Sequence, residues 1–152
     1  MMPRTIELPL ELIELEEQNF HLVLKSELDD GKPACWIVDT GASKTVFDSN
    51  LEDYYELVEA KNDEEYQSAG ISVGMVETRV GRIRRLKFGR VKVKDLKVAL
   101  IDLTHVNEIY RKYRDIRIAG LLGSDVLKTY GCCIDYQHGK ITFLRKPPKI
   151  VK

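Results

Sequence analysis

Residues 34–43, with the sequence ACWIVDTGAS, are the most informative stretch of this chain. The nearly all-apolar residues 34–38 predict a buried, central strand. Asp39 follows at the end of this strand, where a carboxylate costs free energy unless it is hydrogen-bonded or paired. The small residues behind it, 40–43, carry two hydroxyls and accessible amides that could orient that carboxylate. A catalytic Asp39 and an aspartate in an ordinary strand-ending turn both fit these residues.

Short strands joined by tight turns surround this stretch. Alternation of apolar and polar residues predicts a strand over residues 6–12, with Pro9 indicating an edge position, and another over 20–24. An Asp-Gly turn at 29–32 leads into the central strand. Further strands are expected at 45–47, in hairpins between 66 and 100 with turns at Gly70, Gly74 and Gly89, and in a last hairpin formed by 132–136 and 140–144.

Three helices are expected among these strands. The first spans residues 50–58, with Asp48 or Ser49 as its N-cap. The second spans 106–113, with apolar residues at helical spacing and Thr104 as its cap. The third spans 124–130 and ends at Gly131. The sum is an all-β chain with two or three short helices.

Length and composition narrow the class of protein. A chain of 152 residues with 43% hydrophobic residues suits one domain with its own core. Lys plus Arg and Asp plus Glu both total 24, so net charge offers no argument for nucleic acid or an anionic membrane. Three cysteines make no disulfide framework, which favours a reducing compartment. Without a signal peptide or an apolar run of about 18 residues, we expect a cytoplasmic protein without a membrane partner.

One segment departs from this balance. Residues 79–97 hold nine basic side chains against one acidic side chain, that of Asp95. A nucleic-acid groove is one interpretation of such a cluster. The cations alternate with apolar residues as on the solvent face of a strand, and Phe88 is the only aromatic residue available for base stacking. The solvent-face interpretation is favoured, and no nucleic-acid partner is expected.

The sequence lacks the residue patterns that other kinds of catalytic site need. The three histidines have no ligand-like spacing with the cysteines, which argues against zinc. The cysteines lie in apolar, strand-like contexts and are expected to be small core residues rather than nucleophiles. No Gly-x-Ser-x-Gly element is present for a serine hydrolase.

Two motifs resemble those of a known family. Residues 37–43, IVDTGAS, resemble the active-site signature of aspartic proteases. The apolar pair and glycine Leu121, Leu122 and Gly123, followed by a short helix, resemble the loop that crosses beneath the catalytic turn in that family. With the continuation from Gly123 through Ser124 to Tyr136, the chain is similar to bacterial single-domain retropepsin-like proteases over roughly residues 20–143. The resemblance implies one domain over residues 1–152, folded as a closed barrel.

The resemblance also implies an assembly. Asp-Thr-Gly occurs once in the sequence. Asp125 stands at a helix start, where helix capping is expected, and Asp135 has no glycine behind it. Two catalytic carboxylates would therefore require a homodimer in which the Asp39 side chains face each other across the two-fold axis. Such an enzyme would hydrolyse peptide or protein substrates and need no metal or cofactor.

The family pattern assigns supporting roles around Asp39. Thr40 would brace the two turns across the dimer, Ser43 would hydrogen-bond the carboxylate, and Gly41 would let water and substrate approach the backbone. Ala42 completes the turn. A hairpin over 66–80 is either a flap that closes on substrate or a plain hairpin. The candidate flap residues are Gly70, Ile71, Ser72, Val73 and Gly74.

Two alternatives to an enzyme remain open from the sequence. The first is a catalytically silent protein of the same fold that binds peptides or a partner protein. The second is a basic β module that binds RNA or DNA, which would show salt-sensitive binding that persists in Asp39→Ala.

Overall fold

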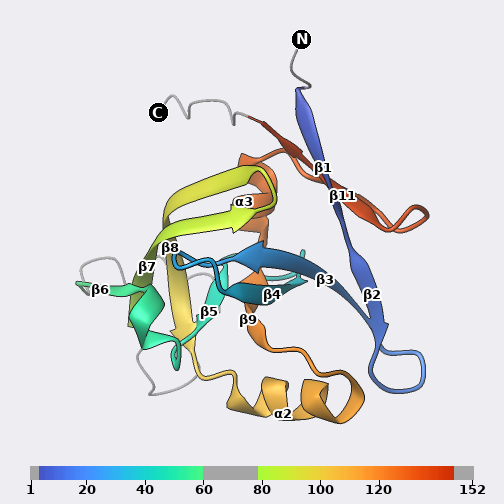
Figure 1. Cartoon of the computed structure of the whole chain (residues 1–152), viewed down its shortest axis with the longest axis horizontal. Coiled ribbons are helices and arrows are strands. Elements are labelled where there is room, and N and C mark those ends of the chain that lie inside the picture. Colours follow the sequence, from blue (N-terminus) through green and yellow to red (C-terminus); the bar gives the residue numbers. More distant parts are fainter. Residues whose placement is uncertain (1–3, 60–78, 146–152) are drawn as a thin grey trace.

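The computed structural model of the chain describes residues 4–59 and 79–145, and strands make up most of it (Figure 1). The expected all-β class with few helices is confirmed. The described elements are β1 (Thr5–Pro9), β2 (Glu11–Glu14), β3 (Phe20–Glu27), β4 (Pro33–Val38), β5 (Val46–Asp48), the 3-10 turn η1 (Glu52–Tyr54), β6 (Glu56–Val58), β7 (Arg79–Phe88), β8 (Val91–Ile101), α2 (Thr104–Tyr113), β9 (Ile118–Leu122), α3 (Ser124–Thr129), β10 (Cys133–Asp135) and β11 (Lys140–Leu144).

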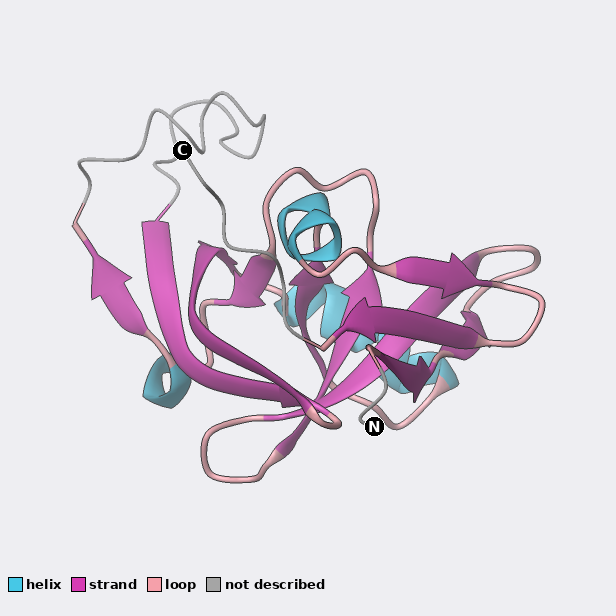
Figure 2. Cartoon of the chain, turned by 90° about the horizontal axis from the view of Figure 1, so that it is seen from above, coloured by secondary structure: helices cyan, strands magenta, loops and turns pink. Residues whose placement is uncertain are grey.

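Six of these strands close into a barrel in the order β3-β4-β9-β5-β8-β7. The pairing of Glu27 with Lys87, between β3 and β7, completes the closure. The β4–β9 and β5–β8 pairs are parallel, and the other pairs are antiparallel. Strand β4 has a partner on both sides, as its apolar sequence predicts. Figure 2 shows the strongly bent strands that this closure requires.

An aromatic cluster fills the barrel below the end of β4. The side chains of Trp36, Phe47 and Phe88 are fully buried. The ring centroids of Trp36 and Phe47 lie 5.6 Å apart, and those of Trp36 and Phe88 lie 5.9 Å apart. The Trp36 Nε1–H donates to Ser26 Oγ at 2.8 Å, and that hydroxyl donates to the Ala34 carbonyl at 3.0 Å. The buried polar atoms are thereby satisfied, and the base of β4 is fixed.

The N-terminal segment forms two strands instead of the single strand expected over residues 6–12. Strand β1 pairs with β11 in a separate sheet of order β1-β11-β10, whereas β2 pairs with β3. The chain changes sheets at Leu10, whose N–H donates to the Gly139 carbonyl at 2.9 Å. Pro9 cannot donate a hydrogen bond, and it lies at the end of β1, which is an edge strand as predicted.

The prediction of a helix over residues 50–58 is wrong. The structure has the short turn η1 followed by β6, which pairs with β7. Asp48 is buried rather than a solvent-exposed helix cap, and its Oδ1 accepts hydrogen bonds from the N–H groups of Asn50 and Leu103 at 3.1 and 3.2 Å. This carboxylate ties the segment to the start of α2, which favours the turn over a continuous helix.

The two later helices are confirmed as α2 and α3, with one correction. Thr104 is the first helical residue, and Leu103 precedes it without a side-chain cap. The Thr104 N–H and hydroxyl both donate to Asp102 Oδ1, at 3.0 and 2.6 Å. The side chain that accepts a backbone N–H at the start of the helix is therefore that of Asp102 rather than that of Thr104. Among the described residues, no helix is long and apolar enough to span a membrane.

Candidate active site

The turn at the end of β4 holds the Asp39 carboxylate in place. The Asp39 N–H donates to the Leu122 carbonyl at 3.0 Å, which anchors the backbone to β9. The Gly41 N–H donates to Asp39 Oδ1 at 3.0 Å, and the Ala42 N–H donates to the Asp39 carbonyl at 3.2 Å. Asp39 is half-buried, whereas Thr40 and Gly41 are exposed. The turn therefore presents an oriented carboxylate at the surface of the chain.

The loop expected beneath this turn lies there. Leu121 and Leu122 continue β9 in parallel register with Ile37 and Val38. Leu122 is fully buried, and Leu121 is half-buried. The Ser124 N–H donates to the Ala42 carbonyl at 2.8 Å. The structure thus brings together two motifs that stand about eighty residues apart in the sequence.

Gly123 makes the closest contact between the two segments. A Cβ atom built there would lie 2.7 Å from the Ala42 carbonyl oxygen and 2.9 Å from the Lys44 carbonyl carbon. Both neighbours are backbone atoms that cannot rotate away. Gly123 is therefore required by the packing of the loop against the turn that carries Asp39.

A buried hydroxyl joins the same two segments. Thr45 has no solvent exposure, and its Oγ1 donates to Asp125 Oδ1 at 2.7 Å while it accepts the Gly123 N–H at 3.0 Å. The Thr45 N–H donates to Asp125 Oδ2 at 3.0 Å. Both Asp125 oxygens therefore bind Thr45, and α3 has no side-chain cap at Gly123. Asp125 Oδ1 also accepts the N–H of Val126, in the first turn of α3, at 2.9 Å. Asp125 therefore serves a free amide at the helix start, as expected, and in addition clamps α3 to the segment that carries Asp39.

Sequence reasoning missed this clamp because its two residues are far apart in the chain. Two local signals could have suggested it. Thr45 directly precedes the apolar pair Val46 and Phe47, and a threonine buried with them needs a hydrogen-bond partner. Asp125 stands two residues after Gly123, the glycine that packs against the turn, so its carboxylate is expected to lie close to the residues that follow the turn.

Other expected residues occupy different surroundings. Ser43 is exposed, and in the part of the chain that the structure describes its hydroxyl makes no hydrogen bond to Asp39. The candidate flap, Gly70 to Gly74, lies outside the described residues. Over residues 4–59 and 79–145, no group of His, Cys, Asp and Glu side chains is arranged to hold a metal ion.

A single chain presents one oriented carboxylate at this turn. Asp39 is not among the residues that line the described cavities. An isolated, oriented surface carboxylate can accept a proton from water, or it can pair with a second carboxylate brought to it. A site formed where two copies meet would not be hollowed in one copy alone.

Comparison with known proteins places this geometry in context. Residues 25–126 match the family model described as "Aspartyl protease". Two solved structures are similar to the chain. A retropepsin-like aspartic protease from Rickettsia conorii is 16% identical, with 91% of this chain and 89% of that chain covered and a TM-score of 0.48. The retroviral protease-like domain of Ddi1 from Leishmania major is 17% identical, with 81% and 87% covered and a TM-score of 0.50, and this second likeness shows the fold. No sequence of a curated protein matches.

Proposed function

This chain belongs to the aspartyl protease family, and from that premise we propose that it is an aspartic endopeptidase active as a homodimer. The observation that carries the proposal is the held carboxylate of Asp39, oriented by the Gly41 amide at the exposed end of β4. The family and the fold support a protease-type function. The dimer is proposed because the sequence holds a single Asp-Thr-Gly turn.

The proposed mechanism uses one Asp39 from each copy. Two carboxylates about 3 Å apart cannot both ionise, so the pair shares one proton, as in aspartic proteases. The ionised Asp39 takes a proton from a water molecule lying between the two side chains. The oxygen of that water attacks the carbonyl carbon of the peptide bond, while the protonated Asp39 donates a hydrogen bond to the carbonyl oxygen. A tetrahedral intermediate forms without a cofactor.

The exposure of the turn supports an isologous interface around it. Thr40 and Gly41 are exposed in one copy, and a two-fold axis beside them would bring the same two residues of the second copy into contact. In this assembly we propose that Thr40 braces the two turns against each other. Gly41, which has no side chain, would let water and substrate approach the backbone closely. Ser43, also exposed, is available to the partner or to the substrate.

We also propose a single domain over residues 1–152 and a cytoplasmic location. The main core cluster joins Leu8 of β1 and Phe143 of β11 to Trp36 and Phe88 of the barrel, which supports one folding unit. Cys35, Cys132 and Cys133 are free thiols, a state typical of a reducing compartment.

Cleavage of a diverse peptide mixture tests the proposal. Wild type, Asp39→Asn and Asp115→Asn are compared at high protein concentration from acid to neutral pH. Asp115 is exposed and lies outside the catalytic turn, so its variant controls for loss of one surface carboxylate. Cleavage by wild type and Asp115→Asn, absent in Asp39→Asn and blocked by a statine-type inhibitor, is expected. Equal background in all three proteins would contradict catalysis, and retained peptide binding would then favour the silent, peptide-binding alternative.

A further inference from the structure

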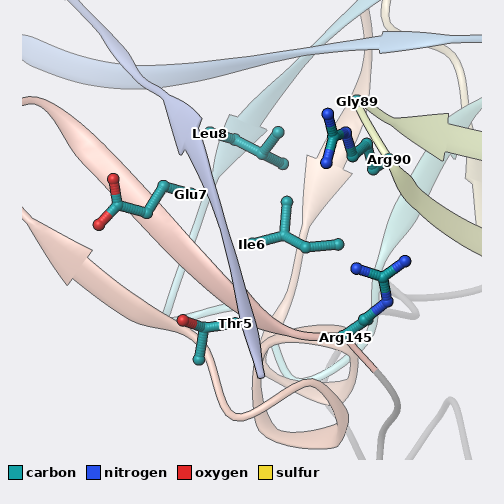
Figure 3. A pocket seen from close by; sticks show the side chains of 7 residues that line it. All are labelled: Thr5, Ile6, Glu7, Leu8, Gly89, Arg90 and Arg145. Carbon is teal, nitrogen blue, oxygen red and sulfur yellow. The ribbon is translucent and has the colours of Figure 1, made fainter. Parts of the chain in front are cut away.

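A pocket of about 620 Å³ lies beside the N-terminal strand β1 (Figure 3). Asp39 is not among its lining residues. Four consecutive residues of β1 line it, together with two residues of the β7–β8 turn and one residue after β11. These residues are Thr5, Ile6, Glu7, Leu8, Gly89, Arg90 and Arg145. Side chains of consecutive strand residues point to opposite faces, so a cavity lined by all four abuts the backbone of the strand.

That stretch of backbone forms an unpaired strand edge. Strand β1 ends the order β1-β11-β10, with β11 on one side only. The Arg145 N–H donates to the Arg4 carbonyl and the Leu10 N–H to the Gly139 carbonyl, so even-numbered residues face β11. In an antiparallel ladder the intervening residues then direct their N–H and C=O groups to the opposite edge. Thr5 and Glu7 therefore offer strand hydrogen bonds that no described strand takes up.

The floor of the pocket is apolar and fixed. Ile6 is half-buried and Leu8 is 9% exposed, and Figure 3 shows both side chains on the pocket side of the strand while that of Glu7 points the other way. Glu7 accepts a hydrogen bond from Lys140 Nζ at 3.0 Å. Gly89, with a φ of 57°, packs so closely on Leu8 that an added Cβ would lie 2.5 Å from Leu8 Cδ2. The β7–β8 turn is thereby held against the floor.

Two guanidinium groups border this floor. Arg90 follows Gly89 and is exposed, and Arg145 follows β11 and is half-buried. Figure 3 shows both on the same side of β1, next to Ile6. Within the described part of the chain, neither of them forms an ion pair. A guanidinium fork without a partner suits a carboxylate, which it can bind through two hydrogen bonds.

We propose that this pocket binds an extended, acidic segment of another polypeptide by strand addition. The segment pairs with Thr5 and Glu7 along the free edge of β1, places an apolar side chain over Ile6 and Leu8, and presents carboxylates to Arg90 and Arg145. Four lining residues of an extended strand correspond to about four residues of ligand. No described lining residue is aromatic, so stacked bases have no platform and an acidic peptide is favoured over nucleic acid. The proposal does not depend on catalysis at Asp39.

Fluorescence anisotropy with three labelled peptides tests the binding mode. The first peptide is Glu-Val-Thr-Val-Glu, blocked at both ends, the second has Gln for both Glu, and the third is the acidic peptide with its central amide N-methylated. The acidic peptide is expected to bind. The affinity of each of the other two is expected to be lower by at least about tenfold, because one lacks the charges and the other lacks a strand donor. Equal affinity for the Gln peptide, equal affinity for the N-methylated peptide, or no binding of the acidic peptide would overturn the proposal.

Matched variants locate the site on the protein. Arg90→Gln and Arg145→Gln are each expected to weaken the acidic peptide by about tenfold. Arg111→Gln, which removes an exposed guanidinium from α2, is expected to leave the affinity unchanged. Equal loss in all three variants would indicate general charge attraction and overturn the proposal. Self-association that depends on Arg90 without peptide binding, or tighter binding of a single-stranded oligothymidylate, would assign the face to a second copy or to nucleic acid instead.

The same titration in Asp39→Asn separates this proposal from the proposed function. Asp39 does not line the pocket, so this variant is expected to bind the acidic peptide with unchanged affinity. If the wild type binds the acidic peptide but cleaves nothing in the diverse peptide mixture, only the protease proposal is contradicted. Cleavage of other peptides without binding at Arg90 and Arg145 would contradict only the proposal for this pocket.

Discussion

Gly41 and Gly123 both lie in the candidate active site, but the chain needs them for different reasons. A Cβ on Gly123 would lie 2.7 Å from a backbone oxygen. A Cβ on Gly41 would have Asp39 Oδ1 as its nearest neighbour, at 3.4 Å, and Gly41 is not among the residues with a positive φ. The fold of one chain therefore has room for alanine at 41, and the need for glycine there arises from what approaches the exposed turn.

Gly41→Ala is expected to separate stability from activity. Its free energy of unfolding should stay within about 0.5 kcal/mol of wild type, while cleavage falls at least about tenfold because the methyl group occupies the space of the water, substrate or partner turn. Gly123→Ala should instead lose about 1–3 kcal/mol of stability. Urea unfolding and peptide cleavage measure both effects. Full activity in Gly41→Ala would contradict the role assigned to that residue.

The Thr45–Asp125 clamp gives a second prediction for single residues. Thr45→Val keeps the shape of the side chain but leaves Asp125 and the Gly123 N–H short of a partner, so we expect a loss of about 2 kcal/mol in the free energy of unfolding. Thr45→Ser retains the hydroxyl and should recover most of that loss. Urea unfolding of the three proteins is the measurement. Equal stability of the valine and serine variants would show that the hydroxyl is unimportant.

At the scale of elements, α2 is fastened to the barrel by two polar contacts. Asn107 binds the backbone of Ile118 in β9 in both directions, donating to its carbonyl at 3.0 Å and accepting its N–H at 2.6 Å. The Tyr110 hydroxyl lies 2.9 Å from His21 Nδ1 in β3, and the side chain is 1% exposed. The helix thereby spans two barrel strands.

Burial of Tyr110 predicts a pH effect on stability. Desolvation raises the pKa of its hydroxyl to about 12 from an ordinary value of 10.0. The folded state therefore holds this proton more tightly than the unfolded state, and the stabilisation is complete below pH 10 and is lost as the pH rises toward 12. Stability should fall more steeply over that range in wild type than in Tyr110→Phe. Parallel curves, measured by urea unfolding, would contradict this assignment.

Elements defined by local patterns could be predicted from the sequence, and elements defined by distant contacts could not. The apolar run before Asp39, the stripe of α2 and the glycine of the β7–β8 turn each carry their signal within a few residues. The expected helix over 50–58 failed because Asp48 is buried against Leu103, more than fifty residues away. The single strand over 6–12 failed because its halves join different sheets, with β11 and β3 as partners.

The candidate site divides in the same way. The family motifs located Asp39 and the loop at Gly123, and the parallel β4–β9 register places them together. The Thr45–Asp125 clamp was missed because its partners stand 80 positions apart, so the local signals at each residue do not identify the other.

At the scale of the whole molecule, the proposed activity depends on two copies of the chain sharing one site. One chain presents one oriented carboxylate on an exposed turn. If activity needs both Asp39 residues, it should rise more than linearly with protein concentration wherever dimers dissociate. A monomeric enzyme would instead show a constant specific activity.

The most direct test mixes wild type with Asp39→Asn. The two proteins are unfolded together and refolded at equal amounts, so that copies pair at random, and cleavage is compared with wild type refolded at the same total concentration. If each site needs an Asp39 from both copies, only dimers of two wild-type chains are active, and about one quarter of the activity should remain. Retention of about one half would show that each chain acts alone and would contradict the shared site.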